Sequence, residues 1–163
     1  MSTPLKQNSS PTQIGTPSER EIRIERTFDA ARERVWRAFT DPEQLAQWWG
    51  RGNKLVVERF ELQRGGHYRF VEHTSAGPQG CEGRFREVTP MERLVQSFEW
   101  DGMPAHVAIK TIEFVDLGAG RTKVVTTLSL HTTEERDGML HSGMEPGMNK
   151  SYAELDKLLA RAA

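Results

Sequence analysis

The chain of 163 residues, of which 36% are hydrophobic, is long enough to form one domain with a single buried core. Its 22 lysine and arginine residues nearly balance 23 aspartate and glutamate residues, so its net charge does not attract nucleic acid or anionic lipid. No apolar run is long enough for a membrane span, and no signal-peptide pattern is present. The single cysteine, Cys81, excludes an internal disulfide framework. We therefore expect a cytoplasmic protein that partners neither nucleic acid nor a membrane.

The first nineteen residues differ in composition from the rest of the chain. They are rich in Ser, Thr, Pro and Gln, with Leu5 and Ile14 as their sizeable aliphatic side chains. Such a segment buries too little apolar area to offset the entropy of ordering. The composition predicts a disordered tail over residues 1–19 and one domain over residues 20–163. A partner-binding peptide within the tail is the less favoured alternative.

The domain begins with a strand and a short helix. Residues 21–29 alternate apolar and polar side chains, a period of two that only Arg26 interrupts. Helical spacing over residues 30–40 predicts the first helix, with Asp29 as its capping residue.

A second short helix follows directly. Asp41 can cap it and Pro42 suits its first position, while Gly50 and Gly52 end it. One face of this helix carries Leu45, Trp48 and Trp49. We expect Trp49, like Trp36 of the first helix, to be a buried structural plug.

The middle of the chain predicts an antiparallel meander. The turn Arg64-Gly65-Gly66, in which a glycine supplies a positive φ, separates two of its strands, and the Gly/Pro-rich residues 75–80 form a loop before the next. Short turns rather than long crossovers argue against alternating βα units. The expected strands cover residues 54–62, 67–73, 81–89, 93–100, 106–117 and 121–130.

The C-terminal residues return to helical spacing, with Met144, Met148, Tyr152, Leu155 and Leu159 along one face. The order of elements predicts an α+β fold in which a curved antiparallel sheet wraps around a long C-terminal helix, because the sheet must cover one face. The two short helices after the first strand would close one end. One helix cannot fill a wide concave surface, so we expect a space between helix and sheet.

Three segments resemble a known family: FDAARERVWRAFTDPEQLAQWWG, LQRGGHYRF and CEGRFREVTPMERLVQSFEW. They are similar to the SRPBCC superfamily, whose START-like fold is called helix-grip. Within it they resemble the branch related to the C-terminal domain of the activator of heat shock protein 90 ATPase. The resemblance covers residues 21–161. Two positions differ: Ala31 stands where proline is common, and Met148 follows Gly147 where tryptophan is common.

The resemblance implies a helix-grip fold with a deep, mainly apolar cavity between the sheet and the terminal helix. Three functions stay open. The leading one is a non-catalytic module that binds a hydrophobic small molecule. The alternatives are a cochaperone-like domain that contacts a chaperone ATPase and an enzyme similar to polyketide cyclases or hydrolases. Fold alone does not decide among them.

Strand parity and the resemblance together indicate which residues would line the cavity. Inward positions of the expected strands carry aromatic side chains, and methionines of the terminal helix adapt to varied ligand shapes. The alternative is an ordinary filled core, which periodicity cannot distinguish from a lined space. The candidate lining residues are Tyr68, Phe70, Cys81, Phe85, Phe98, Trp100, Met144, Met148 and Tyr152.

No catalytic or metal-binding pattern stands out. His67 and His73 share a strand face but lie about 20 Å apart along an extended chain, too far to share an ion. Cys81 has no second cysteine nearby and suits a small buried apolar group. Arg69 and Glu82 favour an exposed cross-strand pair over an acid–base couple. We therefore assign no catalytic residue, metal or cofactor, and expect a monomer or a homodimer whose partner is a hydrophobic small molecule or a chaperone.

Overall fold

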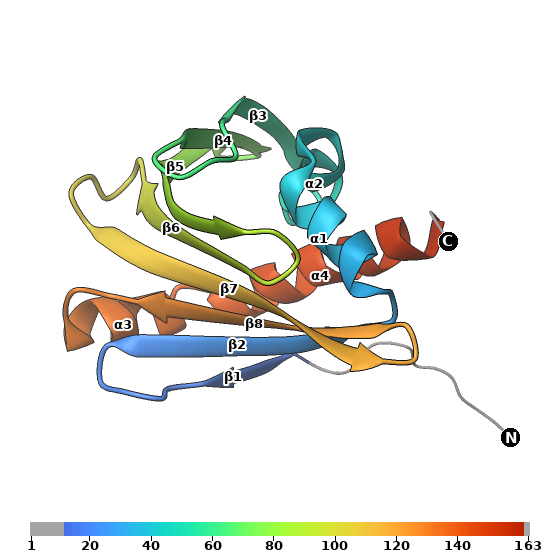
Figure 1. The fold of residues 1–163 in the computed structure, drawn as a ribbon. Coiled ribbons are helices and arrows are strands. Elements are labelled where there is room, and N and C mark those ends of the chain that lie inside the picture. Colours follow the sequence, from blue (N-terminus) through green and yellow to red (C-terminus); the bar gives the residue numbers. More distant parts are fainter. Residues whose placement is uncertain (1–11, 162–163) are drawn as a thin grey trace, which may run out of the picture.

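The computed structural model describes residues 12–161 and shows a curved eight-stranded sheet with four helices (Figure 1). All neighbouring strands are antiparallel, in the spatial order β1-β2-β8-β7-β6-β5-β4-β3. The strands are β1 (Gln13–Gly15), β2 (Glu21–Phe28), β3 (Lys54–Phe60), β4 (His67–Thr74), β5 (Gly77–Thr89), β6 (Arg93–Trp100), β7 (Val107–Gly118) and β8 (Arg121–Ser129). The helices are α1 (Arg32–Thr40), α2 (Pro42–Trp48), α3 (Thr133–Leu140) and α4 (Met144–Arg161).

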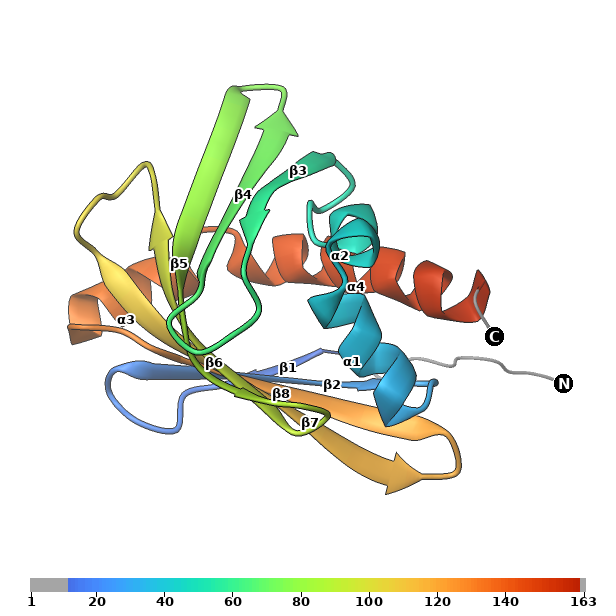
Figure 2. The same ribbon diagram turned by 45° about the horizontal axis from the view of Figure 1, so that its top comes forward.

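The sheet bends around α4, with α1 and α2 on one side and α3 at the other end (Figures 1 and 2). A register shift between Phe85 and Glu87 marks a bulge in β5, a feature that bends a strand. This arrangement confirms the predicted α+β helix-grip architecture, including the two short helices after the first long strand.

The predicted disordered tail is too long at its C-terminal end. Residues Gln13–Gly15 form β1, which pairs with β2 so that Ile14 lies opposite Ile24. Ile14 is partly buried against the core. Composition missed this strand because a three-residue edge strand needs only one apolar side chain to pack. Residues 1–11 lie outside the described part of the chain.

The two expected helix caps have different outcomes. The N-cap of α1 is Ala31, which provides no side-chain cap, so the predicted capping role of Asp29 is wrong. Asp29 lies two residues too early, because a capping side chain bonds to the backbone just after the N-cap. Asp41 does cap α2: its Oδ1 accepts a hydrogen bond from the Glu43 N–H at 3.0 Å.

Two elements differ from the expected boundaries. Part of the predicted loop over residues 75–80 belongs to β5, where Pro78 pairs with His73 of β4. Residues 77–80 extend beyond the partner strand β6, and an unpaired edge tolerates a proline that lacks an N–H. The helix α3 was not expected; the Thr132 hydroxyl caps it by accepting from the Glu135 N–H at 3.0 Å.

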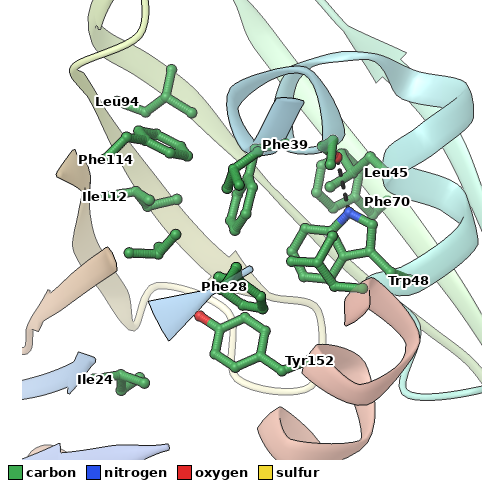
Figure 3. Close-up of a cluster of buried hydrophobic side chains, with 14 of the residues drawn as sticks. Ile24, Phe28, Phe39, Leu45, Trp48, Phe70, Leu94, Ile112, Phe114 and Tyr152 are labelled. Carbon is green, nitrogen blue, oxygen red and sulfur yellow. Dashed lines mark hydrogen bonds between the residues drawn. The ribbon is translucent and has the colours of Figure 1, made fainter. Parts of the chain in front are cut away.

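A cluster of buried side chains joins the inner face of the sheet to α1, α2 and α4 (Figure 3). Trp48 is 3% exposed, and its indole N–H donates to the Ala38 carbonyl at 2.8 Å. Its ring lies 6.2 Å from that of Tyr152, which meets Phe28 edge-on at 5.1 Å. The predicted plug Trp49 is only partly buried, because it ends α2 as the C-cap and points away from Trp48.

The turn between β3 and β4 provides a test of this geometry. Gly65 has a φ of +84°, and a Cβ on Gly66 would lie 2.0 Å from the Glu61 carbonyl oxygen. We expect Gly66→Val to lower the free energy of unfolding by about 2 kcal/mol or more, measured by urea denaturation, since the main chain must shift. As a control, Gly138→Ala in α3 has no atom within 4 Å of the new Cβ and should be neutral or stabilising. A neutral Gly66→Val would contradict the turn as described.

Candidate functional site

The helix α4 covers the inner face of the sheet unevenly. Its C-terminal half buries Leu155, Leu158 and Leu159, whereas the methionines of its N-terminal half, Met144 and Met148, pack against the core yet remain partly exposed. The two methionines near the start of α4 are therefore less completely buried than the leucines near its end.

Two polar contacts hold α4 in place. Arg26, 8% exposed on β2, makes a paired contact with Asp156, with Nη2 2.7 Å from Oδ2. Nearer the N-terminal half, the Ser151 hydroxyl donates to the Trp49 carbonyl and accepts from the Arg51 N–H. The main chain of α4 packs mainly on α2 and stands off the strands, so side chains bridge the distance to the sheet.

The loop after α2 is fixed to the sheet by a buried carboxylate. Glu72, on β4 and 6% exposed, accepts hydrogen bonds from Arg51 Nε and Nη2 at 3.0 Å each and from Asn53 Nδ2 at 2.6 Å. These bonds hold the loop that carries Trp49. The indole of Trp49 meets Phe70 of β4 edge-on at 5.3 Å, and it therefore projects between the helix and the sheet.

A lysine on the inner face of β7 lies beside this indole. Lys110 is on the same strand face as the buried Ala108, Ile112 and Phe114. Its Nζ is 5.6 Å from the ring centre of Trp49 and 5.2 Å from that of Phe98 on β6. We use the name α4 mouth for Trp49, Phe98 and Lys110 together with Met144 and Met148 of α4, whose apolar members are all partly buried against the core.

A groove of about 380 Å³ is lined in part by Gly143 and Gly147, the chain neighbours of Met144 and Met148. It lies between the loop after α2, the β4–β5 turn and the first two turns of α4. Its charged lining residues are basic, Arg51 and Lys150, with no acidic side chain among the described lining residues. The volume is within the range of small-molecule sites, although the groove itself is polar and open. The groove is lined by Arg51, Asn53, Thr74, Ser75, Gly143, Pro146, Gly147 and Lys150.

The structure distributes the nine candidate lining residues over four settings. Tyr68, Phe70, Cys81 and Phe85 are buried on the inner face of the sheet, where the Tyr68 ring lies 5.1 Å from Phe70 and 5.4 Å from Phe85. Phe98, Met144 and Met148 are partly buried at the α4 mouth. Tyr152, in the middle of α4, is buried against Phe28 and Trp48. Trp100, at the end of β6, is 41% exposed and donates from its indole N–H to Gln79.

Sequence reasoning missed Trp49 and Lys110 as residues of this region. A signal for Lys110 was present, because it interrupts the apolar parity of Ala108, Ile112 and Phe114 just as Arg26 interrupts that of β2. No pattern could have placed Trp49 beside Lys110, since the α2 loop and β7 meet only through the tertiary fold.

Burial controls the titratable groups on the inner face. It raises the pKa of the Cys81 thiol to about 12, so the thiol stays protonated at neutral pH and is a poor nucleophile. Burial also lowers the pKa of Lys110 below its usual value, with the nearby Cys81 opposing that shift. Among residues 12–161, no carboxylate forms an ion pair with Lys110, and no His, Cys, Asp and Glu cluster suited to a metal is present.

The outer face of the sheet carries a second groove of about 350 Å³, lined by residues that include His67, Glu82, Arg84 and Glu99. Its charges are of both signs and largely paired, with His67 Nε2 2.9 Å from Glu82 Oε1. Arg69 on the same face lies 3.9 Å from Glu82 and makes a closer pair with Asp101. The expected cross-strand pair of Arg69 and Glu82 therefore belongs to a surface charge network.

The family model described as "Activator of Hsp90 ATPase homolog 1-like protein" matches residues 29–160. The chain belongs to this family. The resemblance predicted from the three sequence segments is thereby confirmed, and the fold is that of the SRPBCC type. No curated protein shows a significant match to the sequence.

Solved bacterial structures share the whole fold. A crystal structure from Rhodobacter sphaeroides is 30% identical, with a TM-score of 0.85 over 93% of this chain and 99% of that one. A crystal structure from Chromobacterium violaceum is 28% identical, with a TM-score of 0.72 over 85% of this chain and 96% of that one. A solution structure from Arthrobacter aurescens, 23% identical and with a TM-score of 0.81 over 91% of each chain, is similar in fold. Within residues 12–161, no helix has the length and apolar character needed to cross a membrane.

Proposed function

We propose that this activator of Hsp90 ATPase homolog 1-like domain binds an apolar small molecule at the α4 mouth. The observation that carries the proposal is the uneven burial along α4. Leucines of its C-terminal half are sealed in the core, whereas Met144 and Met148 stay partly exposed although they face the same interior. Apolar side chains that face inward yet keep contact with solvent favour a ligand that would complete their burial.

The chemistry of the surrounding side chains supports a binding site rather than a catalytic one. Trp49 and Phe98 offer aromatic surface, and methionines adjust their shape to different ligands. The buried thiol of Cys81 stays protonated, and the carboxylate of Glu72 is occupied by Arg51 and Asn53. Neither group is therefore available as a nucleophile or a general base.

A matched pair of proteins tests the proposal. The wild type and Met148→Trp are titrated with the neutral apolar probe biphenyl-4-methanol in thermal melts and by calorimetry. At one hundred times its dissociation constant the probe should stabilise the wild type by about 2.7 kcal/mol. Met148→Trp should weaken binding about tenfold or more, because the larger indole occupies the α4 mouth.

The control is Val115→Trp at a 41% exposed position on β7 away from the α4 mouth, and it should bind the probe as the wild type does. If the probe and a wider panel of lipids, sterols and polyketides leave the wild type unchanged, the binding proposal fails. The chaperone-contacting alternative would then lead.

A further inference from the structure

Lys110 is a half-buried lysine on an otherwise apolar strand face. Its side chain enters an apolar region, and its nearest neighbours with measured geometry are two uncharged rings, Trp49 and Phe98. Contacts with ring faces offset part of the cost of placing an ammonium group there, but they do not neutralise its charge. An ammonium group that is partly removed from water therefore gains from a counter-ion, because the ring contacts return only part of the lost hydration energy.

Within the described residues 12–161, the groups around Lys110 do not supply a counter-ion. Its cross-strand neighbour Gln96 is buried but uncharged, and its amide interacts with the Tyr68 hydroxyl. The Glu72 carboxylate is occupied by Arg51 and Asn53. Burial lowers the pKa of Lys110, and this cost persists whether the amine holds its proton or gives it up.

The position of the amine suggests what would compensate it. Lys110 belongs to the α4 mouth, where the partly exposed rings of Trp49 and Phe98 lie beside its Nζ, and the groove that begins at Gly143 and Gly147 is lined by basic rather than acidic residues. A molecule that enters here would place apolar surface against Phe98, Met144 and Met148. A carboxylate on that molecule would gain a charge-assisted hydrogen bond, one of the stronger polar contacts in a desolvated site.

We propose that Lys110 is the recognition group of this site and that its ligand is an apolar molecule with a single carboxylate, which pairs with Lys110 Nζ. This inference rests on the proposed function and adds the chemical class of the ligand. It also explains why an amine is present on an otherwise apolar strand face. The amine lowers the free energy of unfolding of the protein without ligand, and a bound carboxylate would raise it again.

The test compares biphenyl-4-carboxylate with biphenyl-4-methanol, which share the apolar rings and differ in charge. Calorimetry on the wild type should show the acid binding at least tenfold more tightly than the alcohol. Lys110→Met should reduce this ratio to about one while it keeps alcohol binding, and it should raise the melting temperature of the apo protein. Lys150→Met, which removes an exposed lysine of the adjoining groove, should keep the ratio of the wild type.

Each result that differs from the expected one contradicts a different part of the account. If the wild type binds acid and alcohol equally, or Lys110→Met keeps the preference, the inference fails while the binding function stands. Loss of the preference in Lys150→Met alone would place the acid in the groove and overturn the role of Lys110. A lower melting temperature of Lys110→Met would show that the amine stabilises the apo protein, which also overturns it. If neither probe binds the wild type, the proposed function itself fails.

A second measurement covers the case in which Lys110→Met does not fold. In wild-type protein with ¹³C-labelled lysine, the signal of Lys110 is assigned by its loss in Lys110→Arg. Saturation with the acid should raise the pKa read from this signal, and saturation with the alcohol should not. An unchanged pKa with bound acid would overturn the proposal.

Discussion

Trp48→Ala is expected to lower the free energy of unfolding by about 3 to 5 kcal/mol, the usual cost of removing a buried large aromatic side chain. Trp48 is 3% exposed and packs 4.7 Å from Phe39 and 6.2 Å from Tyr152. Its loss would leave a cavity between α2 and α4 and would free the Ala38 carbonyl from its indole partner. Urea denaturation, followed by circular dichroism, measures the change.

Trp100→Ala provides the matched control. Trp100 is 41% exposed at the end of β6, so its removal should cost less than about 1 kcal/mol. Equal losses for the two variants would contradict the description of Trp48 as a buried side chain that packs on Phe39 and Tyr152.

Asp156→Ala is expected to lower the free energy of unfolding by about 3 kcal/mol. Asp156 pairs with Arg26 in two hydrogen bonds, of 3.2 and 2.7 Å, and Arg26 is 8% exposed. Removal of the carboxylate leaves a guanidinium charge next to the rings of Phe28 and Tyr152 without this counter-ion. Breaking one side of a buried pair is costly for this reason.

Two control variants test whether the cost of Asp156→Ala comes from leaving the Arg26 charge without its counter-ion. The double variant Arg26→Leu with Asp156→Leu should lie within about 1 kcal/mol of the wild type, because no buried charge remains. Glu33→Ala, which breaks an exposed ion pair with Arg37 on α1, should cost no more than about 0.5 kcal/mol. If Asp156→Ala matches Glu33→Ala, the Arg26–Asp156 pair does not anchor α4.

Local chemistry made most of the fold predictable. Alternation over residues 93–100 gave β6 with its observed ends, and Asp41 with Pro42 marked the start of α2. The errors arose where tertiary contacts outweigh local signals. Pro78 is tolerated in β5 because its neighbouring strand ends earlier, and β1 exists because the edge of β2 was available to it.

The candidate site was less predictable, because strand parity indicates which face of the sheet a side chain is on but not how completely that side chain is buried. Phe98 and Trp100 share a face of β6, yet Phe98 packs against the core and Trp100 lies exposed at the strand's end. Likewise Met148 and Tyr152 share a face of α4, but Met148 is partly exposed and Tyr152 is buried. Lys110 was recognisable only as an interruption of parity, and its neighbour Trp49 becomes apparent only once the α2 loop is placed.

A crystal structure of the protein soaked with biphenyl-4-carboxylate tests the central claim most directly. We expect the two rings to lie at the α4 mouth against Phe98 and Met148, with a carboxylate oxygen within hydrogen-bond distance of Lys110 Nζ. A ligand bound only on the outer face of the sheet, near His67 and Glu82, would contradict the account, as would an empty α4 mouth at saturating ligand.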